Sequence, residues 1–106
     1  MIDTDILSTA DPHALPRGLD ILQQGGLIAF PTDTVYGVGG NAFNERAVDS
    51  IYRVKQRPYE NPLPVLIGDA RDLQLIALPL QQHVRALIKK YWPGPLTLVV
   101  PALPGL

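Results

Sequence analysis

Apolar side chains recur at helical spacing in two parts of the chain. Leu15, Leu19 and Leu22 follow one another every three to four residues, and Gly25 and Gly26 then supply a stop at the helix C-terminus. The longest stripe has its apolar residues at i, i+4, i+7, i+8 and i+11, which is the pattern of an amphipathic helix: Leu80, Val84, Leu87, Ile88 and Tyr91. The Pro93-Gly94-Pro95 run ends that helix.

Two further helices are predicted from their capping residues. Residues 45–54 carry the apolar face Val48, Ile51 and Tyr52, and Asn44 stands at the N-cap position. Pro58 prevents any continuation of this helix. Asp69 is placed to cap a short helix that runs to Leu75.

Three short apolar runs predict strands at residues 27–30, 63–67 and 96–100, and residues 31–41 between them read as a loop. Helices alternate with strands, which predicts an α/β fold. The last run is almost continuously apolar, so it requires neighbours on both edges and cover on both faces. The six residues after it, which include two prolines, cannot provide them. We therefore expect residues 1–106 to form one partial domain.

Composition narrows the classes of function without choosing one. The chain is 46% hydrophobic and 18% charged, which is ordinary globular composition, and its net charge of -1 gives no positive field for nucleic acid. The absence of cysteine excludes a disulfide scaffold, a thiolate metal site and a cysteine nucleophile. No basic leader and no apolar run of about 18 residues is present. We expect a cytoplasmic protein that does not contact the membrane.

The loop at residues 31–41 is the first candidate site. Thr32, Thr34 and Tyr36 offer three hydroxyl groups directly after a strand, where ligands of α/β sheets bind. The alternative is a turn whose glycines only reverse the chain. Residues 37–42 match the permissive dinucleotide pattern G-x-G-x-x-A, but they lie too far from the strand, so this match is coincidental. The P-loop pattern is absent.

Three cations at the end of the second helix form another candidate site. Arg53, Lys55 and Arg57 complement the helix dipole, which is a sufficient structural reason for some of them. Lys55 lies three residues beyond Tyr52, so we expect it to be half-buried and to meet an anion. Lys55 and Arg57 together suit triphosphate oxygens. Asn61, in the turn that follows, contacts a nucleotide or only closes the turn.

Several segments resemble the YrdC family. Residues 25–37 read GGLIAFPTDTVYG, which is similar to the opening motif of that family. Residues 55–58, KQRP, resemble its K-x-R signature, residues 61–63 fit the turn after it, and residues 92–97, WPGPLT, resemble a third stretch. The matches keep the family's order over about residues 20 to 100.

The resemblance implies a threonylcarbamoyl-AMP synthase with a twisted mixed sheet and helices around an open cavity. Such an enzyme joins L-threonine, bicarbonate and ATP into threonylcarbamoyl-adenylate and releases pyrophosphate, with Mg2+ accompanying the ATP. A partner transferase then modifies adenosine 37 of tRNA, and any tRNA contact of the synthase itself would be weak. By this resemblance Thr34 binds threonine and Thr32 and Tyr36 line its pocket. Lys55 and Arg57 hold the ATP phosphates, and Asn61 contacts the nucleotide.

Two departures from the family pattern bear on activity. Leu66 stands where some members carry a threonine-binding His, and the S-A-N motif that completes the ATP site is missing. We expect little activity and poor solubility of the 106-residue chain alone. Two alternatives stay open: the YrdC-like module of a carbamoyltransferase, and a non-catalytic RNA- or nucleotide-binding module.

Overall fold

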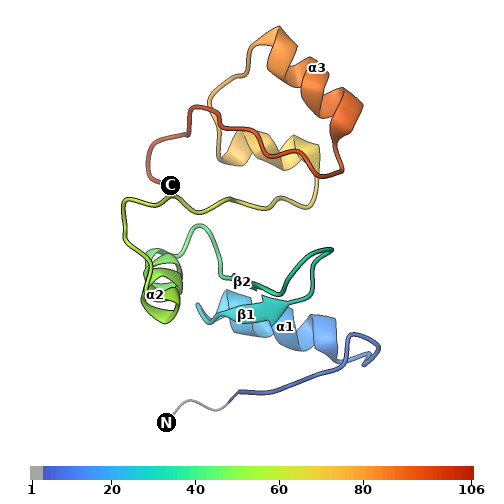
Figure 1. Cartoon of the computed structure of the whole chain (residues 1–106), viewed down its shortest axis with the longest axis vertical. Coiled ribbons are helices and arrows are strands. Elements are labelled where there is room, and N and C mark those ends of the chain that lie inside the picture. Colours follow the sequence, from blue (N-terminus) through green and yellow to red (C-terminus); the bar gives the residue numbers. More distant parts are fainter. Residues whose placement is uncertain (1–3) are drawn as a thin grey trace. The chain divides into compact units, whose positions relative to one another are not determined.

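The computed structural model describes residues 4–106, which form two compact units that divide between residues 61 and 62 (Figure 1). The first unit contains α1 (Ala14–Gln23), β1 (Ile28–Phe30), β2 (Gly37–Gly39) and α2 (Glu45–Lys55). The second contains the 3-10 helix η1 (Ala70–Leu75) and α3 (Gln82–Tyr91). The four predicted helices and the first predicted strand are confirmed, and the α/β class is confirmed with them.

β2 lies inside the segment that the sequence predicts to be loop. It pairs with β1 in an antiparallel hairpin, with Phe30 opposite Gly37 and Ile28 opposite Gly39. The ring of Phe30 explains why glycines form this strand, since an added Cβ at Gly37 or Gly39 would lie 3.0 or 3.1 Å from it. The aromatic ring therefore covers the face from which the glycine side chains are missing.

α2 supplies most of the core of the first unit. The side chain of Asn44 caps it by accepting a hydrogen bond of 3.1 Å from the N–H of Ala47, as the sequence predicts. Ala47 is fully buried, and Ile51 and Tyr52 are nearly so. Gly40 allows this packing, because a Cβ there would lie 3.3 Å from that of Ala47.

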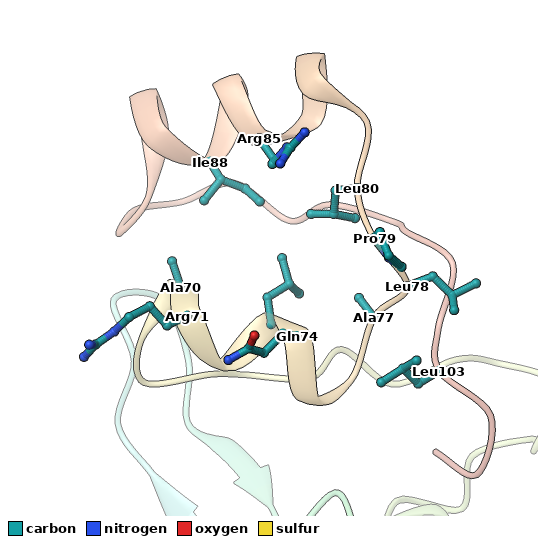
Figure 2. A pocket seen from close by; sticks show the side chains of 11 residues that line it. Ala70, Arg71, Gln74, Ala77, Leu78, Pro79, Leu80, Arg85, Ile88 and Leu103 are labelled. Carbon is teal, nitrogen blue, oxygen red and sulfur yellow. The ribbon is translucent and has the colours of Figure 1, made fainter.

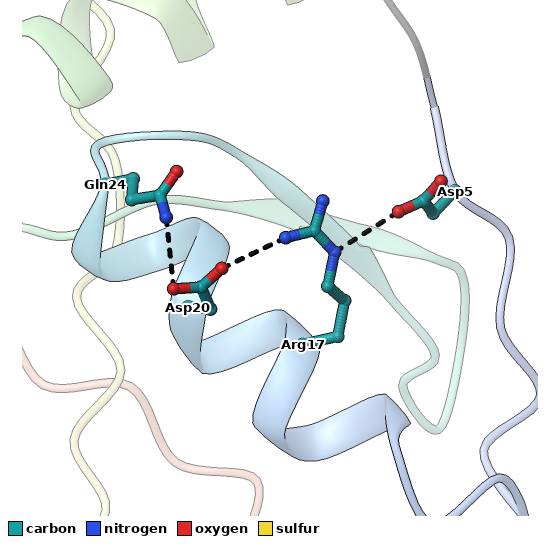
Figure 3. Close-up of polar contacts among 4 residues, drawn as sticks. All are labelled: Asp5, Arg17, Asp20 and Gln24. Atoms are coloured by element: carbon teal, nitrogen blue, oxygen red, sulfur yellow. Dashed lines mark hydrogen bonds and ion pairs between the residues drawn. The ribbon is translucent and has the colours of Figure 1, made fainter.

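α1 packs against β1 and carries a polar network on its outer face (Figure 3). The guanidinium of Arg17 bonds Asp5 at 3.2 Å and Asp20 at 3.0 Å, and Asp20 also accepts from the amide of Gln24 at 3.1 Å. These groups are about half exposed, so each ion pair contributes little to stability. Their effect is to attach the segment around Asp5 to the helix.

In the second unit, η1 begins at the predicted cap. Asp69 accepts from the N–H of Arg71 at 2.8 Å and also pairs with its guanidinium at 3.0 Å. The hydrogen bonds from Arg71, first from its side chain and then from its backbone, lower the pKa of Asp69. The unit is closed by a bridge between Ala77 and Ala102.

A cavity of about 490 Å³ opens between η1, α3 and the C-terminal segment (Figure 2). Its walls are mostly apolar and include Leu73, Leu80, Ile88 and Leu103. Two residues of the helical stripe predicted for residues 80–91, Leu80 and Ile88, thus line this space.

The predicted strands at residues 63–67 and 96–100 are wrong for this structure. Both segments are outside the strands, and the sheet of the described residues has two antiparallel strands rather than a wider mixed set. A strand exists only when a partner satisfies its backbone groups, and apolar character alone cannot supply one.

No helix of the described residues is both long and apolar enough to cross a membrane.

Candidate functional site

The loop that joins β1 to β2, here called the threonine loop (residues 31–36), is held by the hydroxyl of Thr32. That hydroxyl donates to the carbonyl of Val35 and accepts from the N–H of Thr34 at 3.3 Å. The Thr34 hydroxyl lies 3.4 Å from Thr32 Oγ1. Either hydroxyl can be the donor in this pair, and a hydroxyl oxygen keeps lone pairs that can accept in both cases. The lone pairs of Thr34 Oγ1 can therefore accept from a ligand.

The three candidate side chains of the threonine loop all lie at the surface. Thr32 and Thr34 are exposed, and Tyr36 is 77% exposed. Val35, between them, is 72% exposed and adds an apolar contact surface. The hairpin thus gathers polar and apolar groups at one end, in a combination that suits a small amphiphilic ligand such as an amino acid.

The basic end of α2 stops at a Schellman motif. The N–H of Gln56 donates to the carbonyl of Arg53 at 3.2 Å, and the N–H of Arg57 donates to the carbonyl of Tyr52 at 2.9 Å. Gln56 adopts the left-handed conformation that this motif requires, with φ 52° and ψ 44°. The chain turns sharply at Gln56, between the two cations Lys55 and Arg57.

The three cations of this segment have different surroundings. Arg53 pairs with Asp49 one turn earlier at 3.1 Å, so its charge is matched within the helix. Arg57 is half-buried. The expectation that Lys55 is half-buried is wrong: it is exposed, because it is the last residue of α2 and no layer of this unit covers that level of the helix. An exposed lysine still offers a mobile point charge to an anion.

The segment after α2, residues 57–61, is fastened back onto the helix. The hydroxyl of Tyr52 donates to the backbone carbonyl of Asn61 at 2.7 Å. The rings of Tyr52 and Tyr59 stack with centroids 4.9 Å apart, and the Tyr59 hydroxyl donates to Asp49 at 2.7 Å. We call these three residues, Asp49, Tyr52 and Tyr59, the tyrosine brace. The hydrogen bond to Asp49 raises the pKa of Tyr59; desolvation and the charge of Asp49 act in the same direction, and Arg53 opposes them.

The residue types of the threonine loop and of the basic end of α2 are sufficient to find both from the sequence, whereas the tyrosine brace is not found in this way. From the sequence, Tyr52 belongs only to the apolar face of the helix and Tyr59 has no predicted role. The spacing of Asp49 and Arg53, four residues apart on a helix, was a signal for their ion pair. The contact between Tyr52 and Asn61 crosses a turn, and residue spacing does not reveal such contacts.

The candidate residues can bind a ligand through hydrogen bonds and can neutralise negative charge on it. Neither role requires a protein nucleophile. The threonine loop offers hydroxyl groups, and the end of α2 offers Lys55 and Arg57. Both groups belong to the first unit. The hydroxyl groups suit a small polar molecule, and the two cations suit an anion.

A comparison with protein families decides the relationship. The family model Sua5/YciO/YrdC, described as telomere recombination, matches residues 20–106. The chain belongs to the Sua5/YciO/YrdC family. The resemblance of residues 25–37 and 55–58 to YrdC motifs is thereby confirmed.

Relatives in the Sua5/YciO/YrdC family carry a specific enzyme name. A threonylcarbamoyl-AMP synthase of Bacillus subtilis is 45% identical over 101 residues, which cover 95% of this chain and 29% of that protein. The threonylcarbamoyl-AMP synthase of Pyrococcus abyssi is 46% identical over 80 residues, which cover 76% of this chain and 24% of that protein.

A solved structure extends the comparison to three dimensions. The crystal structure of P. abyssi Sua5 complexed with L-threonine matches with a TM-score of 0.78 and 42% identity, over 82% of this chain and 26% of that one. The chain of this Sua5/YciO/YrdC family member thus spans between 24% and 29% of the length of these relatives.

Proposed function

We propose that this chain carries the L-threonine-binding and ATP-phosphate-binding residues of an L-threonylcarbamoyladenylate synthase. The enzyme would condense L-threonine, bicarbonate or CO2 and ATP to threonylcarbamoyl-AMP and pyrophosphate, for modification of adenosine 37 in tRNA. The observation that carries the proposal is the threonine loop. It presents three surface hydroxyl groups, in a chain 42% identical to a protein crystallised with L-threonine.

Thr34 is assigned to the threonine substrate. Its Oγ1 is at the surface and can accept from the substrate ammonium. A hydrogen bond to a charged donor is stronger than a neutral one, which makes this a binding contact of some weight. Thr32 fixes the loop, and Tyr36 lines the same end of the hairpin.

Lys55, Arg57 and Asn61 are assigned to ATP. Lys55 is exposed and can reach a phosphate as a point charge, whereas the guanidinium of Arg57 can hold two phosphate oxygens at once. Asn61 lies at the end of the segment that the tyrosine brace fastens to α2. Its side chain can contact the nucleotide while its backbone is held.

The reaction needs positioning and charge neutralisation. The ammonium of threonine loses a proton to solvent, and the free amine attacks CO2 and loses a second proton to form a carbamate. A carbamate oxygen then attacks the α-phosphorus of ATP, and pyrophosphate leaves. Holding the reactants together and matching the phosphate charge supply the catalysis. Among residues 4–106 no group of three or more His, Asp or Glu is placed to hold a metal ion. Mg2+ would be bound through the ATP phosphates.

Residues 1–106 would form one part of a larger domain. The share of 24% to 29% of the relatives' length supports this, as do the extended segments 63–67 and 96–100, which lack strand partners among the described residues. The remaining part would supply the Ser and Asn that complete the ATP site in the family. The product would pass to a separate transferase in the cytoplasm, with little tRNA contact by the synthase.

The assignment of Thr34 predicts a graded loss of threonine binding. Thr34→Ala should weaken L-threonine binding about 10-fold or more, because it removes a hydrogen bond to a charged group worth about 1.5–3 kcal/mol. Thr34→Ser keeps the hydroxyl and should bind within about threefold of the unchanged chain. Binding is measured by titrating L-threonine into 15N-labelled chain.

Thr97→Ala serves as the matched control, since Thr97 is also exposed but belongs to the second unit. Equal affinity of the Ala and Ser variants at position 34 would refute the assignment. A pyrophosphate-release assay on the full-length protein separates the classes of enzyme. Release that depends on carbamoyl phosphate rather than on threonine would favour the carbamoyltransferase module instead.

A further inference from the structure

We propose that the tyrosine brace positions the ATP-binding segment, residues 57–61, and that Tyr52 is its central positioning residue. This inference rests on the proposed function and deepens it. In this inference Asp49, Tyr52 and Tyr59 increase the affinity for ATP without contacting it. Within the segment, the proposed contacts to ATP are made by Arg57 and Asn61.

Tyr52 holds both ends of this segment. Its backbone carbonyl accepts from the N–H of Arg57 at 2.9 Å, and its hydroxyl donates to the carbonyl of Asn61 at 2.7 Å. The ring itself is 9% exposed and belongs to the core of α2. Tyr52 therefore holds two of the three residues that are assigned to ATP: Arg57 through its own backbone carbonyl, and Asn61 through its hydroxyl. Both contacts are made to backbone atoms of the segment.

Tyr59 fixes the middle of the segment. Its ring stacks on Tyr52 at 4.9 Å, and its hydroxyl donates to Asp49 at 2.7 Å. Asp49 would by itself repel a triphosphate, but Arg53 pairs with its other oxygen at 3.1 Å. The pair of Arg53 and Asp49 thus offers an anchor for Tyr59 at little net charge.

Holding this segment in advance lowers the ordering cost of binding. A flexible loop loses backbone and side-chain freedom when it closes on a ligand, and that loss subtracts directly from affinity. Pro58, at the start of the segment, already restricts the backbone. The brace adds two hydrogen bonds and a ring contact, so the phosphate-binding groups are arranged before ATP arrives.

The test compares phenylalanine variants of three tyrosines in the full 106-residue chain. Tyr52→Phe keeps the ring and its stack but loses the bond to Asn61, and Tyr59→Phe loses only the bond to Asp49. Tyr91→Phe is the matched control, a tyrosine of α3 in the second unit. ATP and L-threonine affinities are measured on each variant, and 15N relaxation reports the mobility of residues 57–61.

Tyr52→Phe should weaken ATP binding about fivefold, as expected for the loss of one neutral hydrogen bond, and should mobilise residues 57–61. L-threonine affinity should stay unchanged, which a general loss of structure would not allow. Tyr59→Phe should show a smaller loss in the same direction, and since its hydroxyl bond is exposed it keeps the test informative if Tyr52→Phe does not fold. Unchanged ATP affinity in both variants would overturn the positioning role while the proposed function stands. Failure of the unchanged chain to bind ATP while it still binds L-threonine would overturn the assignment of Lys55, Arg57 and Asn61, and the inference with it.

Discussion

Gln56 combines an unfavourable backbone conformation with a position between the two cations assigned to ATP. Its φ of 52° lies in the left-handed region, which L-residues with a Cβ populate at a cost of about 1–2 kcal/mol. Glycine is the usual residue at this position of a Schellman motif. Since the Gln56 and Arg57 amides both bond back to α2, the turn persists in spite of this cost.

Gln56→Gly should therefore stabilise the end of α2 by about 0.5–1 kcal/mol, because glycine adopts the left-handed conformation without strain and loses part of that gain to its greater freedom when unfolded. Amide hydrogen exchange at Gln56 and Arg57 measures the change. Gln24→Gly is the matched control, since Gln24 ends α1 with φ -85°. If both glycine variants shift exchange equally, the left-handed strain at Gln56 is not the cause.

Residues of the site differ in how far the sequence predicts their surroundings. The chemistry of Thr34, Lys55 and Arg57 depends on residue type and position, so the sequence alone could identify them as candidate binding residues. The exposure of Lys55 could not, because helical spacing gives the side of a helix but not which layer covers it. The bond between Tyr52 and Asn61 depends on how residues 57–61 turn, which no local pattern states.

At the scale of elements, α2 carries the Asn44 cap at one end and the cations proposed to bind ATP phosphates at the other. Asn44→Ala should destabilise α2 by about 1 kcal/mol, because the N–H of Ala47 loses its side-chain acceptor. Asn44→Asp keeps the acceptor and adds a favourable charge at the helix N-terminus, so it should match or exceed the stability of the unchanged chain. Hydrogen exchange of the Ala47 amide reports both variants. Equal protection in the two variants would contradict the capping role.

Helices and strands were predictable to different degrees for a physical reason. The signals of α2 and η1, which are the caps Asn44 and Asp69, lie within one turn of the structure they start. A strand takes its hydrogen bonds from another segment, so the apolar run at residues 63–67 predicts burial but cannot supply a partner. The opposite error occurred at β2, which is a strand in the structure but was predicted to be loop. Its glycines have low strand propensity, and their place in the strand is explained by packing against the ring of Phe30.

At the scale of the whole molecule, each unit leaves apolar groups uncovered. In the first unit Leu15 is 87% exposed, and in the second Leu66 is 77% exposed. Isolated apolar side chains at a surface are normal. An exposed extended segment made of apolar residues is unusual, because it resembles a strand without a partner. The segment 96–100 is such a case, because its side chains alternate between half-buried and exposed as they would in a sheet.

Val99 in that segment is 99% exposed, and no strand of the described residues pairs with its backbone. Unpaired extended backbone with apolar side chains is a template for association between copies. The chain should therefore self-associate as its concentration rises, and Val99→Lys should shift it toward the monomer in sedimentation velocity experiments. Thr97→Lys adds the same charge on the same face without removing an apolar group, so it should have the smaller effect. A chain that stays monomeric at every concentration would show that this segment is already satisfied, and the partial-domain proposal would lose one of its two supports.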